Sequence, residues 1–437
     1  MIKAENKTGL VFFPAFDWAI DPTHPEREER LLYTQDQVFE EGLFDIEGIT
    51  EFKPSLVTPE DIRRVHFCAP DIESVTTPSH FVSAGGAVTI AEEVMKGTVE
   101  KGFALVRPPG HHAMRVVHGN RGFCNINIEA IMIEHLRARH GVKKVAIVDT
   151  DCHHGDGTQD IYWHDPDTLF ISIHQDGRTL YPGSGFIEEM GGPNAIGTTL
   201  NIPLPPLTSD EGYLWTIEHV VLPILDEFKP DIIINSAGQD NHFSDPLTNM
   251  NFSARGYADL TALLNPDIAV LEGGYSIEGA LPYVNTGIIL AMAGIDYRGI
   301  REPGYDAARI AEPADVFRQV REVGQAVLST WRQREALSAR LVDGRETVSR
   351  RRNIMYDTDM IYEMQIDEVC VCKECHGALK VDSSSDTGHH LFGVHIPKGA
   401  CPSCRAKAEA WFEASEKGPY TLRTMQDLDQ GRFFDLR

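Results

Sequence analysis

The chain lacks the features that mark membrane-spanning, secreted and disulfide-stabilised proteins. Its 437 residues contain no run of 18 apolar residues, and the first residues, MIKAENKTGLVFF, hold no long apolar stretch of the kind found in signal peptides. Eight cysteines are too few for a disulfide scaffold in a chain of this length. From these absences we expect a cytoplasmic protein.

Basic residues are also scarce, since 40 Lys and Arg stand against 65 Asp and Glu for a net charge of −25. Such a surface repels the phosphates of nucleic acids and of anionic lipids, so we expect neither as a direct partner. It could attract cationic substrates such as lysine-rich tails or polyamines, although acidity also serves solubility alone. The sequence leaves open whether copies of the chain form a homo-oligomer.

Apolar runs and amphipathic stretches alternate between residues 100 and 290. The runs predict buried strands and the stretches predict helices, a pattern typical of a parallel sheet with helices on both faces. The predicted strands are 103–106, 145–148, 169–173, 232–234 and 268–271, and the predicted helices are 126–139, 211–228 and 254–264. We therefore expect an α/β fold.

Polar residues follow each predicted strand at the point where it ends. In chain order these segments are RPPGHHA, DTDCHHGDG, HQDG, NSAGQDNH and EGGY. Ligands of parallel sheets bind beyond the carboxyl ends of the strands. Five such segments together predict a single polar site at one edge of the sheet.

A candidate metal site follows from the second and fourth segments. Residues two apart after a strand point to the same side, so Asp149, Asp151 and His153 would converge. Asp240, after the strand at 232–234, would complete a set of two carboxylates and one imidazole with one coordination position open. This donor set suits zinc, and also iron, cobalt or manganese.

Acid–base groups surround this candidate site. His111 and His112 are adjacent imidazoles that can exchange protons near neutral pH, and Asp149 and Asp156 are carboxylates available to orient them. Tyr275 follows two glycines at another strand end, where its phenol could donate a hydrogen bond to a developing oxyanion.

Two Cys-x-x-Cys pairs, separated by 25 residues, lie near the C-terminus. This spacing predicts a closed, structural zinc ribbon with four cysteine ligands, whose folding energy comes from the metal. A thioredoxin-like redox pair is the competing interpretation. The four cysteines are Cys372, Cys375, Cys401 and Cys404, and the alternative ligands are Cys370, His376 and His389.

The motifs together resemble those of histone deacetylases, closest to class II enzymes and their bacterial relatives, which include acetylpolyamine amidohydrolases. The resemblance covers roughly residues 10 to 300 and includes DPTHPEREERL at residues 21–31. The motifs that carry it stand in family order: RPPGHHA, GFCNINIEA, VDTDCHHGDGTQDIYW, ISIHQD with YPGSG, NIPLP, SAGQDNHFSDPL and LEGGY.

The resemblance implies an arginase-like α/β fold, a parallel sheet between helices, with a zinc ion at the base of a narrow tunnel. It implies that Asp151, His153 and Asp240 are the zinc ligands. It pairs His111 with Asp149 and His112 with Asp156, and it makes Tyr275 the oxyanion donor. The tunnel-lining residues that it implies are Phe123, Tyr181 and Gly273.

The resemblance also implies potassium sites. One would use Asp149, Asp151, His153 and Ser172, and a second would lie near Tyr162, Asp165 and Thr168. The predicted organisation is a deacetylase domain at 1–335, a connector at 336–365, the zinc-ribbon module at 366–412 and a tail at 413–437. The module could mediate oligomerisation, bind a partner or shape the tunnel mouth.

The expected activity is zinc-dependent removal of acetyl groups from N-acetyl-lysine of proteins. Hydrolysis of acetylpolyamines and a non-catalytic acyl-lysine-binding scaffold are the alternatives, and other acyl chains stay open. An arginase-type two-metal site is disfavoured, because Gly155 and His242 stand where further carboxylates would be needed.

Overall fold

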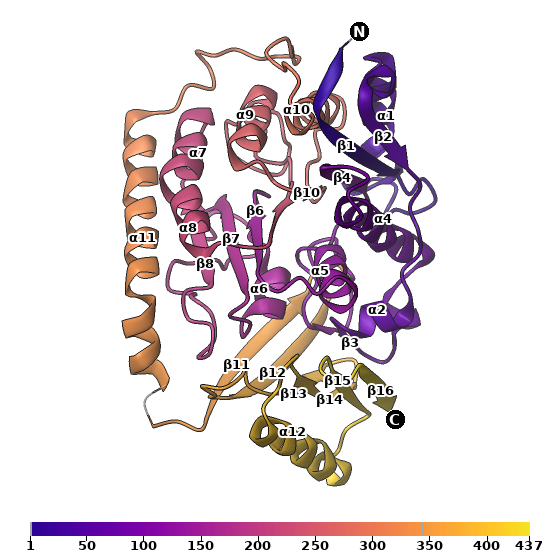
Figure 1. The fold of residues 1–437 in the computed structure, drawn as a ribbon, viewed down its shortest axis with the longest axis vertical. Coiled ribbons are helices and arrows are strands. Elements are labelled where there is room, and N and C mark those ends of the chain that lie inside the picture. The colour runs from indigo at the N-terminus through magenta and orange to yellow at the C-terminus, as the bar shows by residue number, and fades with distance from the viewer. Residues whose placement is uncertain (1, 343) are drawn as a thin grey trace.

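The computed structural model describes residues 2–342 and 344–437, and an eight-stranded parallel sheet lies at its centre (Figure 1). The strand order is β2-β1-β4-β10-β9-β6-β7-β8. The predicted α/β class and the five predicted strands are confirmed, whereas β1, β2 and β8 were not predicted. The bounds are β1 Lys3–Phe13, β2 Glu47–Phe52, β4 Lys101–Val106, β6 Val145–Asp149, β7 Thr168–Gln175, β8 Thr199–Leu204, β9 Ile232–Ser236 and β10 Ile268–Val270.

Helices cover both faces of this sheet (Figure 1). The three predicted helices are confirmed as α5, the α7–α8 pair and α9, and a π-helical turn at Ile217–Val221 separates α7 from α8. The bounds are α1 Leu32–Glu40, α2 Pro59–Arg63, α3 Ile72–Val75, α4 Pro78–Met95, α5 Ile128–Arg139, α6 Asp156–Tyr162, α7 Asp210–Thr216, α8 Leu222–Phe228, α9 Ala254–Leu264, α10 Leu281–Met292 and α11 Ala314–Val342.

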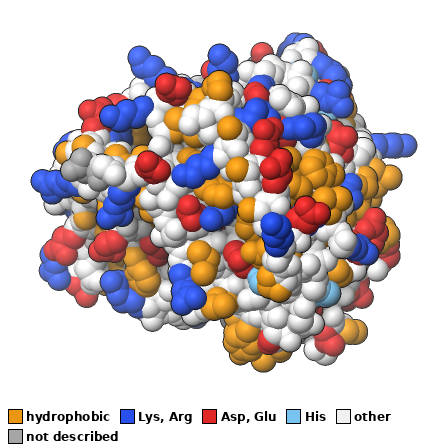
Figure 2. All heavy atoms as spheres, turned by 90° about the horizontal axis from the view of Figure 1, so that it is seen from below, with side chains coloured by type: hydrophobic (Ala, Val, Ile, Leu, Met, Phe, Trp, Pro, Cys, Tyr) orange, Lys and Arg blue, Asp and Glu red, His pale blue; other side chains and the backbone are white. Residues whose placement is uncertain are grey.

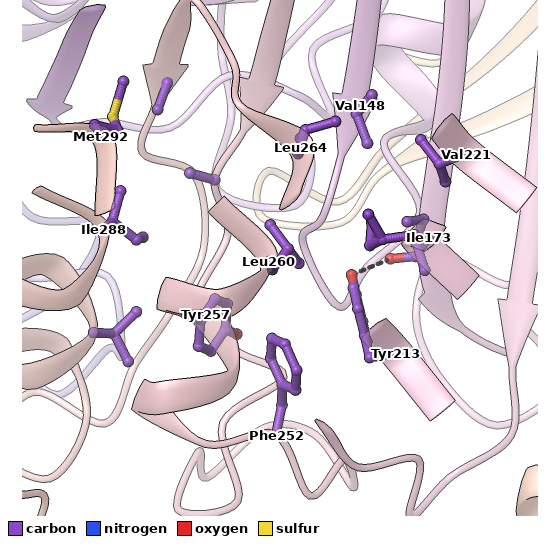
Figure 3. Close-up of a cluster of buried hydrophobic side chains, with 14 of the residues drawn as sticks. Val148, Ile173, Tyr213, Val221, Phe252, Tyr257, Leu260, Leu264, Ile288 and Met292 are labelled. Atoms are coloured by element: carbon purple, nitrogen blue, oxygen red, sulfur yellow. Dashed lines mark hydrogen bonds between the residues drawn. The ribbon is translucent and has the colours of Figure 1, made fainter. Parts of the chain in front are cut away.

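Strand β6 shows how the sheet separates two apolar cores. Because successive side chains of a strand point to opposite faces, Ala146 and Val148 pack in one core while Val145 and Ile147 pack in the other. Figure 3 shows the first core, where Val148 and Ile173 of the sheet face the helices. The hydroxyl of buried Tyr213 donates to the Ile173 carbonyl at 3.2 Å, which satisfies its polar end.

The C-terminal region is a second sheet of six strands with one helix packed on it (Figure 1). Neighbouring strands are antiparallel except β14 and β15. The predicted zinc ribbon is therefore part of a larger β-region, and the segment predicted as a connector carries the end of α11, β11 and the start of β12. The bounds are β11 Thr347–Tyr356, β12 Ile361–Cys370, β13 Leu379–Ser385, β14 His390–Ile396, α12 Pro402–Ala414, β15 Leu422–Asp427 and β16 Arg432–Leu436.

A buried ion-pair network joins the two regions. The carboxylate of Asp160 in α6 lies 3.2 Å from Nη2 of Arg350 and 2.5 Å from Nη2 of Arg352, both in β11. Arg350 also pairs with Asp367 of β12 at 2.8 Å.

On the face of the molecule seen from below, acidic and basic side chains are interspersed (Figure 2). Among the described residues, no helix has both the length and the apolar character needed to cross a bilayer.

Candidate active site

The predicted metal ligands come together at the carboxyl edge of the parallel sheet. Strands β6 and β9 are neighbours, with Asp149 opposite Ser236, so the segments that follow them meet. Nδ1 of His153 lies 2.7 Å from Oδ2 of Asp240 and 3.2 Å from Oδ1 of Asp151. One ligand atom from each of the three residues lies within 4.8 Å of the other two.

The surroundings of these three side chains fit a divalent cation. Both carboxylates are fully buried. Although burial opposes a charge on His153, Asp240 and Asp151 raise its pKa to about 10, so this position attracts positive charge. Two carboxylates and an imidazole are also a donor set typical of catalytic zinc.

Backbone groups hold the two carboxylates in place. The amide of Gly273 donates to Oδ2 of Asp151 at 2.6 Å, and the amide of Cys152 donates to Oδ1 of Asp240 at 2.7 Å. A Cβ on Gly273 would lie 2.5 Å from Asp151 and 2.6 Å from Asp240, so only glycine fits there. The structure thus places Gly273, which the sequence predicted in the tunnel wall, directly against the metal-binding set.

Two His–Asp pairs stand beside this set, as the sequence predicted. Nδ1 of His111 lies 3.1 Å from Asp149, and Nδ1 of His112 lies 2.7 Å from Asp156. Burial and the neighbouring His111 lower the pKa of His112 to about 3, so His112 is a neutral imidazole. For His111, burial opposes a charge, but Asp151 and Asp149 raise its pKa well above the usual range.

Tyr275 and Phe123 form an aromatic pair near the site. Their rings meet edge to face at 5.6 Å, and the Arg30 guanidinium lies over the Tyr275 ring at 4.9 Å. The Tyr275 backbone amide donates to Asp245 at 2.7 Å. Burial raises the pKa of Tyr275, so its phenol stays protonated and can donate.

The structure also shows residues that sequence reasoning missed. Arg121, two positions before Phe123, donates through Nε to Oδ2 of Asp156 at 3.1 Å and so fixes the carboxylate that orients His112. Arg121 stands between the motifs RPPGHHA and GFCNINIEA, and this position is the sequence feature that could have pointed to it. The centroid of the ring of Tyr181, a residue that the resemblance placed in the tunnel wall, lies 5.2 Å from that of His112. Asp357, far along the chain, accepts the Tyr181 hydroxyl at 2.8 Å.

The residues of the predicted potassium sites are also neighbours. Ser172 of β7 stands in register with Asp149 of β6, and its hydroxyl lies 2.9 Å from Nδ1 of His174. In the second set, the Thr168 hydroxyl donates to Asp165 at 2.7 Å, and Arg137 lies against that same carboxylate. Potassium binding at both places stays a prediction.

The four C-terminal cysteines form a separate cluster of atoms that could bind a metal. All four are free thiols, and their sulfurs lie within 4.8 Å of one another. Cys372 lies 3.8 Å from Cys401 and 3.7 Å from Cys375. Four sulfurs at about 2.3 Å from a tetrahedral zinc ion would be about 3.8 Å apart. The spacing therefore fits a closed zinc site with four cysteine ligands.

Comparisons with known proteins agree with this chemistry. A family model described as the histone deacetylase domain matches residues 72–289. A probable deacetylase of Archaeoglobus fulgidus is 45% identical over 324 residues, which cover 68% of this chain and 89% of that protein. The chloroplastic histone deacetylase 14 of Arabidopsis thaliana is 40% identical over 219 residues, 47% of this chain and 51% of that one.

Two further proteins, one of them a solved structure, are also similar to this chain. A histone deacetylase-like amidohydrolase of Pseudomonas aeruginosa is 35% identical over 246 residues, 54% of this chain and 63% of that protein. Among solved structures, the crystal structure of the HDA15 HD domain matches with a TM-score of 0.64 at 27% identity, covering 78% of this chain and 99% of the other.

Proposed function

Because this chain belongs to the histone deacetylase family, a family of zinc-dependent hydrolases, we propose that it removes acetyl groups from N-acetyl-lysine side chains of proteins. The observation that carries the proposal is the convergence of Asp151, His153 and Asp240 beside two buried His–Asp pairs. These are the groups that amide hydrolysis needs: a metal site with an open position, a base and an acid.

The side chains would divide the work as follows. Asp151, His153 and Asp240 would hold a zinc ion, which would supply a Lewis acid for the acetyl carbonyl and would lower the pKa of water. His112, oriented by Asp156 at 2.7 Å, would take a proton from the attacking water, and a protonated histidine of the pair would deliver one to the leaving amine.

Tyr275 would stabilise the charge that develops on the acetyl oxygen. Its phenol is protonated and buried, and both Phe123 and Arg30 contact its ring. A donor that is fixed before the reaction starts costs no reorganisation when the oxyanion forms.

The proposal includes further ions. The four C-terminal cysteines would hold a structural zinc ion, since their sulfur spacing fits tetrahedral coordination. Potassium would bind beside the metal-binding set through Asp149 and Ser172, which are neighbours on β6 and β7. The deacetylase domain is proposed at 1–335 and the zinc-binding module at 366–412, within the C-terminal sheet.

Acetylpolyamines are the second candidate substrate. The net charge of −25 favours cationic substrates, and both lysine-rich proteins and polyamines are cationic. The geometry of the acid–base groups serves either amide equally, so only turnover separates the two.

The test measures acetate release from an acetyl-lysine peptide and from acetylputrescine, with zinc-loaded protein. Faster peptide turnover is the expected result, and faster acetylputrescine turnover would move the substrate to polyamines. In Tyr275→Phe, loss of one oxyanion donor should lower kcat about 10²- to 10³-fold on the preferred substrate. Tyr305→Phe, a half-exposed tyrosine, is the matched control. Absence of turnover on both substrates, with metal bound, would contradict the proposal.

A further inference from the structure

The turn between β11 and β12 brings the C-terminal region to the candidate active site. In Figure 1 these two strands extend from the C-terminal sheet toward α5 and α6. Oδ1 of Asp357 accepts the backbone amide of Gly122 at 3.0 Å and the hydroxyl of Tyr181 at 2.8 Å. Two residues further on, Oδ2 of Asp359 accepts the amide of Asn120 at 2.6 Å. The turn therefore bonds to two separate segments of the catalytic region.

Both groups that bond to Asp357 lie against the ring of His112. The Tyr181 ring meets the His112 ring edge to face at 5.2 Å. On the other segment, a Cβ added to Gly122 would overlap Cδ2 of His112, so the backbone touches the imidazole. One carboxylate oxygen thus ties together two surfaces that confine the same ring.

The hairpin also holds the partner of His112. Arg121 donates to the carbonyl of Met355 at the end of β11 and, through its Nε, to Oδ2 of Asp156. Asp156 in turn bonds Nδ1 of His112 at 2.7 Å. The next residue after Gly122 is Phe123, whose ring packs on Tyr275. A shift of the hairpin would therefore reach His112 by two routes.

We propose that Asp357 is a positioning residue for hydrolysis, which holds Gly122 and Tyr181 against His112 so that the imidazole keeps its reactive orientation. The C-terminal sheet is then part of the active site and not an appended module. This inference rests on the proposed function, because it needs His112 to act in the reaction.

Three variants separate positioning from general stability. Asp357→Ala removes both bonds and should lower kcat by about 10- to 10²-fold, because small misplacements of catalytic groups have effects of this size, while KM changes little. Asp357→Asn keeps an acceptor oxygen at the same place and should recover kcat to within about fivefold of wild type. Asp231→Ala is the control, since Asp231 also accepts two backbone amides, from Lys143 and Lys144, but at the amino edge of the sheet.

Tyr181→Phe gives an independent check on the route. If Asp357 acts through the Tyr181 hydroxyl, the loss in the double variant Tyr181→Phe with Asp357→Ala should be well below the product of the single losses. A purely additive double variant, or an Asp357→Asn variant as slow as Asp357→Ala, would overturn the proposal. So would Asp231→Ala losing as much kcat as Asp357→Ala.

A structural readout keeps this inference distinct from the proposed activity. Crystal structures of the Asp357→Ala and Asp357→Asn proteins should show the Tyr181 ring displaced from His112 in the first and retained in the second. That result would stand even if acetyl-lysine proved to be the wrong substrate. A Tyr181 ring that stays in place in Asp357→Ala would contradict the positioning role, whatever the turnover.

Discussion

The catalytic candidate set and the four-cysteine cluster lie in different kinds of surroundings. Asp151 and Asp240 follow neighbouring strands of a buried sheet, and each accepts a backbone amide, so the protein itself fixes them. The four cysteines lie in the loop after β12 and at the start of α12, and three of them are partly exposed. Backbone amides also reach three of the four cysteine sulfurs, at 3.3–3.4 Å. Because the cysteines lie in a loop and at a helix start and not at the end of a buried sheet, we expect the second set to depend on an ion for its shape more than the first does.

The largest effect is expected when one of the three candidate ligands Asp151, His153 and Asp240 is removed. Asp240→Asn should lower the rate of acetate release by more than about 10³-fold, beyond the loss of one oxyanion donor. Its melting temperature should fall only slightly, because Asn can still accept the Cys152 amide and Asp151 remains as a carboxylate partner of His153. Zinc content should fall from two ions to one.

Asp231→Asn, on the exposed amino edge of the sheet, is the matched control for zinc content and melting temperature. If Asp240→Asn melts well below that control, the catalytic set is not held by the backbone alone and the contrast between the two clusters fails.

Removal of ligands from the four-cysteine cluster should instead lower the stability of the C-terminal region. In the double variant Cys401→Ser with Cys404→Ser, we expect the C-terminal region to lose more than about 5 kcal/mol, a conservative share of what structural zinc supplies in small domains. Limited proteolysis should then cut between residues 371 and 405, and zinc content should again fall to one ion.

Cys370→Ser is the control for this cluster, because Cys370 is buried next to the four cysteines but is not among those that converge. Full zinc content and protease resistance in the double variant would mean that the apolar cluster around Phe392 and Phe412 folds this region without metal.

A third prediction concerns the contact between the two regions. Asp160→Asn would remove the carboxylate that lies 3.2 Å from Nη2 of Arg350 and 2.5 Å from Nη2 of Arg352, while Asp367 stays paired with Arg350. Loss of one partner from a buried ion-pair network costs about 3–5 kcal/mol. Urea unfolding followed by circular dichroism should show this loss. Asp296→Asn, which breaks an exposed pair with Arg298, should leave the unfolding curve nearly unchanged, and equal losses in the two variants would contradict burial as the cause.

The sequence predicted the residues at the carboxyl edge of the parallel sheet because the strands and the polar segments after them are each recognisable from short stretches of sequence. The buried strands of the parallel sheet are continuous apolar runs, and parallel strands place their polar ends at one edge. Asp151 and Asp240, which are 89 residues apart, could therefore be brought together without a structure. Strand β8 was missed because its sequence, TLNIPL, includes Asn201 and Pro203 among its apolar residues.

The hairpin β11–β12 was missed for a different reason. Its polar side chains lie on the buried face and several of its apolar side chains lie on the exposed face. Glu363, Gln365 and Asp367 are buried against the other region, while Tyr362 and Met364 are exposed. On β11, Arg350 and Arg352 point into the same ionic network. Strands with a polar buried face do not show the usual alternation, so the predicted connector at 336–365 concealed the segment that carries Asp357.

The smallest predicted effect tests whether the buried polar groups of the catalytic region are as fixed as the comparison requires. Both ring nitrogens of His66 form hydrogen bonds. Nδ1 donates to the Met114 carbonyl at 2.8 Å, and Nε2 accepts the Asn127 backbone amide at 2.8 Å. Burial lowers the pKa of His66 to about 4, against about 6.5 in an unfolded chain. The unfolded state therefore binds the proton first, and stability is lost as pH falls from about 6.5 toward 4.

For this one group the loss should be about 1.4 kcal/mol per pH unit across that window. Other groups titrate there too, so the measurement is the difference in slope between wild type and His66→Gln, from urea unfolding at pH 6.5, 5.5 and 4.5. The amide of Gln can donate and accept as the neutral imidazole does, but it cannot take a proton. Equal slopes would mean that the folded protein accommodates a charged His66, and that the groups around His66 rearrange when it is protonated.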